Sequence, residues 1–179
     1  MWWHQTVLLV IMLILTVGRL AFGQWQVSLS ILWWWLGGVV GFLFVFSDRL
    51  VHSLVTNPQE VLSLKVKELF LSKKLGEGLK ALVLERGQQN NLMMRSVLFV
   101  VIWLILAFWT MVGVTAPLAR GFMLGMGAHF IFDLLWDYRV KKGDLSFWFW
   151  QVKRSVSLEE QRWFVLVVSF LGGLVILGL

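Results

Sequence analysis

PLARGFMLGMGAHFIFDLLWDY, residues 117–138, is the stretch that decides the fold class of this chain. Its length suits a helix that crosses about 30 Å of hydrocarbon, which takes about 20 residues. Pro117 fits the first turn of such a helix, because the N–H that proline lacks would have no partner there. Small and ionisable residues recur at four-residue steps and so share one slowly winding face: Gly121, Gly125, His129, Asp133 and Asp137.

The composition of the whole chain fits a membrane protein. Of its 179 residues 59% are hydrophobic and 15% are charged, and 12 are Trp and 14 Phe. Soluble proteins carry about 25% charged residues. We therefore predict a single all-α membrane domain over residues 1–179. The chain has no cysteine, which excludes disulfides, iron–sulfur clusters, cysteine zinc sites and thiol catalysis.

Apolar stretches of membrane length occur five times. They predict a polytopic protein with five transmembrane helices. The last stretch starts with the capping-box pattern Ser157-Leu158-Glu159-Glu160, which is typical of a helix N-terminus. The predicted spans lie near residues 6–23, 27–47, 96–115, 117–138 and 158–179.

The basic residues predict the orientation in the cell membrane. Fourteen of the 16 Lys and Arg lie in residues 49–95 and 139–162, which share one side of a five-span protein. An excess of Lys and Arg marks the cytoplasmic side, so the N-terminus is expected inside and the C-terminus outside. Arg19 and Arg120 then lie near the outer boundary, where their stems can snorkel. The basic balance predicts contact with a bilayer that includes anionic lipid, and no nucleic acid is expected.

A cytoplasmic amphipathic helical hairpin is predicted over residues 57–88. Asn57-Pro58-Gln59-Glu60 has the pattern of an N-cap followed by proline at the first helical position. A break near residues 74–78 precedes a second short helix. The hairpin is either a structural connector or a docking platform for a cytoplasmic protein partner.

A short aromatic helix is predicted over residues 144–153. Asp144 can cap it, and it contains the run Phe147-Trp148-Phe149-Trp150. Aromatic residues collect at the membrane interface, so we expect an interfacial helix with its aromatic side at headgroup depth.

Glycines predict which helices pack together. Gly37 and Gly41 in the second span match Gly121 and Gly125 in the fourth, and such pairs let helix backbones approach closely in lipid. Both spans run from outside to inside. If their glycine faces pack, two acid–histidine pairs come to nearly the same depth at the cytoplasmic side: Asp48 with His52, and His129 with Asp133.

Three interpretations of these four residues are open. The first is a structural network: His129 forms a hydrogen bond with Asp133, and Asp48 or Arg49 completes the network. The second is a divalent metal site, zinc or manganese, because two histidines and two aspartates are suitable ligands. The third is a proton or ion pathway, which needs further ionisable groups across the bilayer. Apart from such a metal no cofactor is expected.

Residues 125–133, GMGAHFIFD, resemble the His-x-x-x-Asp helix of bacterial membrane-bound metal-dependent hydrolase-like proteins. In such proteins an Asp-x-Asp-His motif closes an earlier helix. The matching place here, Phe46-Ser47-Asp48-Arg49, keeps one aspartate and lacks the first acid and the histidine. The family's further histidine-rich motif has no counterpart. The resemblance therefore implies a degenerate site, with catalysis altered or absent.

No catalytic residue can be assigned from these patterns. The leading prediction is a non-enzymatic membrane scaffold or interaction protein with a His/Asp network inside the membrane. The alternative is a divergent metal-dependent hydrolase whose site, built from Asp48, His52, His129 and Asp133, lies at the cytoplasmic face.

Overall fold

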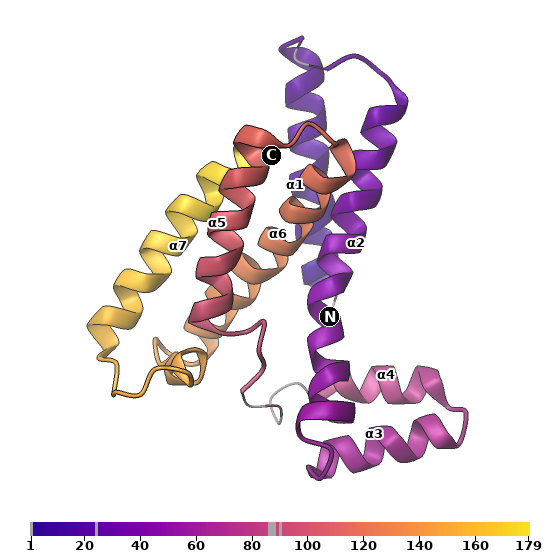
Figure 1. Ribbon diagram of the computed structural model, residues 1–179, viewed down its shortest axis with the longest axis vertical. Helices are drawn as coiled ribbons and strands as arrows, with labels where there is room; N and C mark the ends of the chain where they lie inside the picture. Colours follow the sequence, from indigo (N-terminus) through magenta and orange to yellow (C-terminus); the bar gives the residue numbers. More distant parts are fainter. Residues whose placement is uncertain (1, 24, 86–88, 90) are drawn as a thin grey trace.

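The computed structural model describes residues 2–23, 25–85, 89 and 91–179, with residues 2–4 described by their backbone alone. Within these ranges the chain is helical and contains no strand, which confirms the all-α class. Five long helices occupy the five predicted positions (Figure 1). They are α1 (Trp2–Ala21), α2 (Leu29–Val51), α5 (Val97–Gly113), α6 (Pro117–Val140) and α7 (Leu158–Gly178).

Three of the described helices are long and apolar enough to cross a membrane. They are the continuous helix Leu29–Thr56, which extends α2, and the helices Pro117–Val140 and Leu158–Gly178. Two further apolar helices, Gln5–Ala21 and Val97–Gly113, are shorter. The structure therefore has helices that could span a membrane, as the sequence predicts, whereas five spans remain a proposal.

Helix α6 is the centre of the bundle. It contacts α1 and α2 on one side and α5 and α7 on the other, as Figure 1 shows. The core around it contains the fully buried side chains of Trp34, Trp103, Leu124 and Phe130. Two predicted helix starts are confirmed as well, with Pro117 at the first helical position of α6 and a complete capping box at Ser157 and Glu160.

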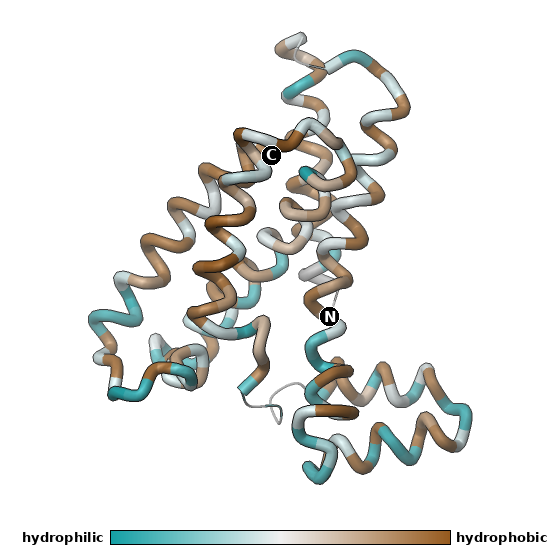
Figure 2. The backbone as a smooth tube through the Cα atoms, in the orientation of Figure 1, coloured by the Kyte–Doolittle hydropathy of each residue, from teal (hydrophilic) through white to brown (hydrophobic). Residues whose placement is uncertain are grey.

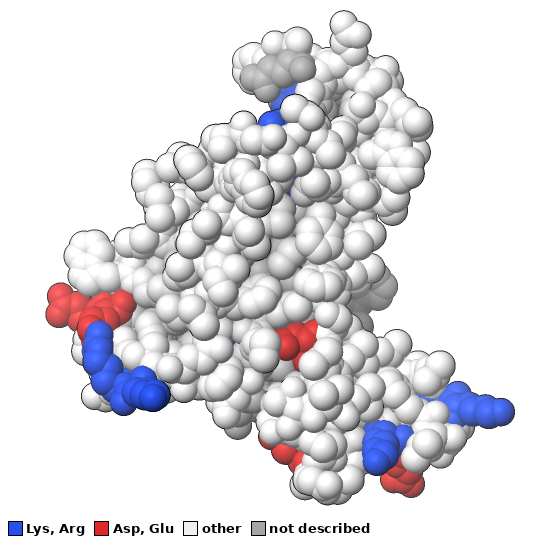
Figure 3. All heavy atoms as spheres, in the orientation of Figure 1, with Lys and Arg blue, Asp and Glu red and all other residues white. Residues whose placement is uncertain are grey.

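The outer faces of the long helices are apolar and exposed. Figure 2 shows hydrophobic residues along the whole length of α5 and α7, with hydrophilic ones near the lower ends. In Figure 3 the middle of the visible face carries almost no charge, and the lysines, arginines and carboxylates collect mainly at the lower end. The exposed side chains on these faces include Leu13, Leu43, Trp109 and Phe170. Such a band of apolar surface between charged ends is what a bilayer would cover.

The predicted helical hairpin is present as α3 (Val61–Leu71) and α4 (Leu75–Leu84). The two helices pack on each other through Leu62, Val66 and Leu82, and in Figure 1 they project sideways from the lower end of α2. Lys73 forms the turn between them in the left-handed region, at φ 59°. The part of the prediction at 86–88 lies outside the described residues.

The predicted start of the hairpin at Asn57 is wrong. Residues His52–Thr56 continue α2 as a π-helical turn, η1, which ends where the N–H of Asn57 donates to His52 O at 2.8 Å. α3 then begins at Val61. The physical reason is that nothing before Pro58 breaks the helix of α2, so it continues to Thr56, and Asn57, the residue before proline, is its C-cap; helices usually end at or before that position.

The predicted interfacial helix 144–153 is also corrected. Only Ser146–Phe149 is helical there, as the 3₁₀ turn η3, and both Leu145 and Trp148 are fully buried in a second core. Asp144 does not cap this turn, whose N-cap is Leu145 without a side-chain cap bond; Asp144 lies just before it, and its Oδ1 accepts the N–H of Ser146 at 3.0 Å. That bond holds the pKa of Asp144 below its ordinary value. The segment closes one end of the bundle, and Trp148 serves as a core residue.

Candidate functional site

The seam between α2 and α6 is built on glycine, as the sequence predicts. A Cβ atom placed on Gly41 would overlap the carbonyl oxygen of Phe122, and one on Gly125 would overlap that of Gly38. Gly37 and Gly121 face the partner helix backbone in the same way. Larger residues here would keep the backbones apart. The predicted close packing of these two helices is confirmed.

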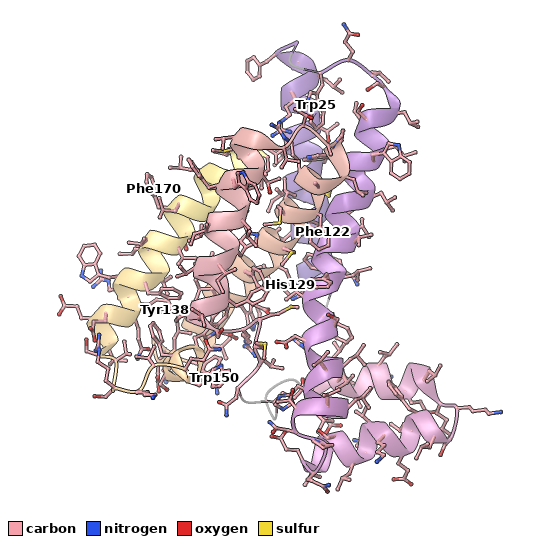
Figure 4. The ribbon with its side chains drawn as sticks, viewed as in Figure 1. Trp25, Phe122, His129, Tyr138, Trp150 and Phe170 are labelled. Atoms are coloured by element: carbon pink, nitrogen blue, oxygen red, sulfur yellow. The ribbon has the colours of Figure 1, made fainter. Side chains whose placement is uncertain are left out.

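His129 ties α6 to α2 inside this seam. Its Nδ1–H donates to the carbonyl oxygen of Phe42 at 2.9 Å, and the two rings lie 4.5 Å apart between centroids. On its other side, Nε2 of His129 lies 3.6 Å from Oδ2 of Asp133. Figure 4 shows His129 between the two helices. His129 therefore links α6 to the backbone of α2 and lies beside Asp133. A structural network completed by Asp48 or Arg49 stays a prediction.

Asp48 and His52 lie one helical turn apart and bond to different segments. Oδ2 of Asp48 accepts the backbone N–H of Met94 at 2.8 Å, which fastens the segment before α5 to α2. His52, at 2% exposure, has its Nε2 3.1 Å from Oε2 of Glu60 at the start of α3. Its Nδ1 is buried and has no hydrogen-bond partner among the residues that the structure describes. Both residues therefore hold the junction between α2, the hairpin and α5.

The structure does not assemble the four predicted metal ligands into a recognisable site. Within the described ranges, no group of three or more His, Asp or Glu side chains is placed to hold a metal ion. Each of Asp48, His52 and His129 instead contacts a protein group on another segment. A metal site of Asp48, His52, His129 and Asp133 stays a prediction.

A buried charged cluster at the lower end of α6 was not predicted from the sequence. Nε–H of Arg95 donates to Oδ2 of Asp137 at 2.8 Å, its Nη2 bonds the same oxygen, and the indole N–H of Trp148 donates to it at 2.9 Å. The guanidinium also lies 5.1 Å from the ring centre of Phe147. Asp137 continues the four-residue step after Asp133, and this spacing was the sequence feature that could have indicated Asp137 as part of a buried site. Nothing in the sequence marked Arg95 as its partner.

Gln161 supplies the remaining link at this end. Its Oε1 accepts the N–H of Leu145 at 2.5 Å, and its Nε2 donates to Val156 O at 3.0 Å. The side chain is buried in the first turns of α7. It therefore joins α7 to the turn that carries Trp148.

Comparison with protein families, curated proteins and solved structures gives no match.

Proposed function

We propose that this chain is a five-span protein of the cell membrane with its N-terminus in the cytoplasm and its C-terminus outside. The apolar flanks and the gathering of charge at one end support this placement (Figure 3). α5 has 17 residues, which is about the shortest length that crosses a bilayer. The ends of α2 and α6 and the starts of α5 and α7 lie together at the lower end of Figure 1. They flank the two segments that hold 14 of the 16 Lys and Arg.

A reporter fusion tests this orientation. An enzyme that is active only outside the cytoplasm should be active when fused after Leu179 and inactive when inserted at the hairpin turn, near Lys73. The reverse pattern would overturn the orientation. Activity at both positions would show an even number of spans between Lys73 and Leu179, where three are proposed.

We further propose that the protein acts as a non-enzymatic scaffold or interaction protein. The observation that carries this proposal is the set of partners to which the buried polar side chains of the protein bond. Asp48 bonds a backbone N–H, His129 a backbone carbonyl, and Asp137 an arginine and an indole. Catalytic groups converge on a space that a substrate can enter, whereas these groups join helices to one another.

The hairpin is the surface that this scaffold would present. It projects from the bundle on the side that we assign to the cytoplasm (Figure 1). Its far end exposes Leu71 and Leu75 beside Lys73 and Lys74. An apolar patch with a basic rim suits either a protein partner or the anionic inner leaflet.

Metal analysis separates this proposal from the metal-dependent hydrolase. We expect the purified full chain to hold no stoichiometric zinc or manganese after dialysis against either ion. Asp133→Ala should then lower thermal stability and change nothing in metal content, because Asp133 serves the α2–α6 network. Glu68→Ala, at an exposed position of α3, is the control, because it also removes one carboxylate but does so outside the predicted metal site. One metal ion per chain, lost in Asp133→Ala and retained in Glu68→Ala, would favour the hydrolase.

A further inference from the structure

A pocket lies at the end of the bundle opposite the charged cluster. It has a volume of about 370 Å³, and its wall comes from the start of α2, the start of α6 and the segments before them. Its lining residues Ser28 and Ser30 are exposed, so the pocket is open to the surroundings, and Trp25 and Trp34 line it as well. Figure 4 shows Trp25 at this upper end.

Arg120 brings a positive charge into the pocket wall. Its Nε–H donates to Val114 O at 2.7 Å and its Nη2 to Met111 O at 3.0 Å. Both acceptors are carbonyls at the C-terminal end of α5, where a cation is favoured by the helix dipole. A guanidinium has five N–H donors, so these two bonds hold its orientation and leave others for a ligand.

Arg19 adds a second positive charge against the two tryptophans that line the pocket. Its guanidinium lies 4.7 Å from the ring centre of Trp25 and 5.6 Å from that of Trp34, and its Nη2 donates to Leu177 O at 3.1 Å. The residue is 9% exposed, so it is buried and does not snorkel as its sequence position suggested. Within the described residues neither Arg19 nor Arg120 is paired with a carboxylate side chain.

The surrounding sequence cannot supply that negative charge from a side chain. All ten Asp and Glu lie between residues 48 and 160, and residues 1–47, 97–132 and 161–179 contain none. Two helices also begin at the pocket, α2 at Leu29 and α6 at Pro117. Neither has a capping hydrogen bond from a side chain or an acidic residue in its first turn. Their N-terminal dipoles therefore add to the positive potential of the arginines.

We infer that this pocket binds a phosphate group, presented by the headgroup of an anionic phospholipid of the outer leaflet. Phosphate matches the donors that meet here, which are a guanidinium, serine hydroxyls and two helix N-termini. The exposed side chains of Val27, Leu29 and Leu32 next to the pocket would contact acyl chains. The inference needs the proposed membrane placement, and it is independent of whether the hairpin binds a partner.

Lipid titration of the full chain in neutral detergent micelles, read by native mass spectrometry, tests the site. Phosphatidylglycerol should bind several-fold more tightly than phosphatidylcholine, whose choline adds a positive charge. Arg120→Gln should weaken phosphatidylglycerol binding about tenfold or more, because hydrogen bonds to charged groups carry that much affinity. Arg139→Gln, which removes one charge from the opposite end of α6, should leave this binding unchanged.

Ser30→Glu is a second variant that tests the same site if the loss of Arg120 unfolds the protein. Ser30 is exposed in the first turn of α2, where a carboxylate favours the helix. The variant should fold at least as well as the unmodified chain and lose the tight binding, because its own carboxylate neutralises the pocket. Undiminished phosphatidylglycerol binding in Ser30→Glu would overturn the site. Inorganic phosphate that bound as tightly as the lipid, and was lost in Ser30→Glu, would overturn the lipid as its source.

Discussion

Gly125→Val is expected to separate α2 from α6 and to leave little folded protein. Even the first side-chain atom would overlap the carbonyl oxygen of Gly38, which belongs to the backbone of α2 and cannot rotate away. Overpacking of a core that can adjust costs about 1–3 kcal/mol, and a backbone-to-backbone overlap should cost at least the upper part of that range. Thermal unfolding in detergent, followed by circular dichroism, measures the effect.

Gly173→Val is the matched control for this substitution. Gly173 also lies within a long apolar helix, α7, but a Cβ placed on it meets no atom of another described segment within 4 Å. Its replacement should change the free energy of unfolding by less than about 1 kcal/mol, the range of ordinary helix propensities. Equal losses in the two variants would show that glycine is needed here for a reason other than the α2–α6 approach.

Asp137→Ala is expected to be the most damaging change at the lower end of the bundle. It would leave the guanidinium of Arg95 and the indole N–H of Trp148 without their shared acceptor. The side chains of Arg95 and Asp137 are 12% and 5% exposed, and removing one partner of a buried pair costs about 3–5 kcal/mol. The free energy of unfolding in detergent should fall by a similar amount.

Two further variants distinguish a buried ion pair from general fragility. Lys65→Ala breaks the ion pair between Lys65 and Glu85, whose side chains are 52% and 30% exposed, respectively. Exposed pairs contribute about 0–1 kcal/mol to stability. It should therefore be nearly silent. The double variant Arg95→Met/Asp137→Leu should be less destabilised than Asp137→Ala, because it leaves no unpaired charge. A double variant that is worse than the single one would contradict this account of the cluster.

The sequence predicted the features of the fold that depend on local spacing. The five long helices follow from apolar runs, and the approach of α2 to α6 follows from Gly37, Gly41, Gly121 and Gly125. A four-residue step determines which residues share a face. The depth at which two such faces meet is then determined by the helical rise.

What the sequence missed depends on groups far apart in the chain. Asp48 bonds to Met94, which follows the hairpin, and Asp137 bonds to Arg95. Neither Met94 nor Arg95 lies on the same helix as the aspartate that it bonds, so no helical spacing relates the two. Trp148 looks interfacial by its aromatic neighbours, but the carboxylate of Asp137 gives its N–H a buried acceptor, so the ring can enter the core.

Cysteine cross-linking in native membranes tests the central claim, that α2 and α6 pack face to face, most directly. The chain has no cysteine of its own, so introduced pairs report without background. Phe44 on α2 and Phe122 on α6 have ring centres 5.5 Å apart, whereas Phe170 lies on α7, away from α2 (Figure 4). A short bifunctional thiol reagent, whose spacer replaces the reach of the two rings, should join Phe44→Cys to Phe122→Cys within one chain and should not join Phe44→Cys to Phe170→Cys. If all three thiols are reactive and the 44–122 link still fails to form, the two helices do not pack as described.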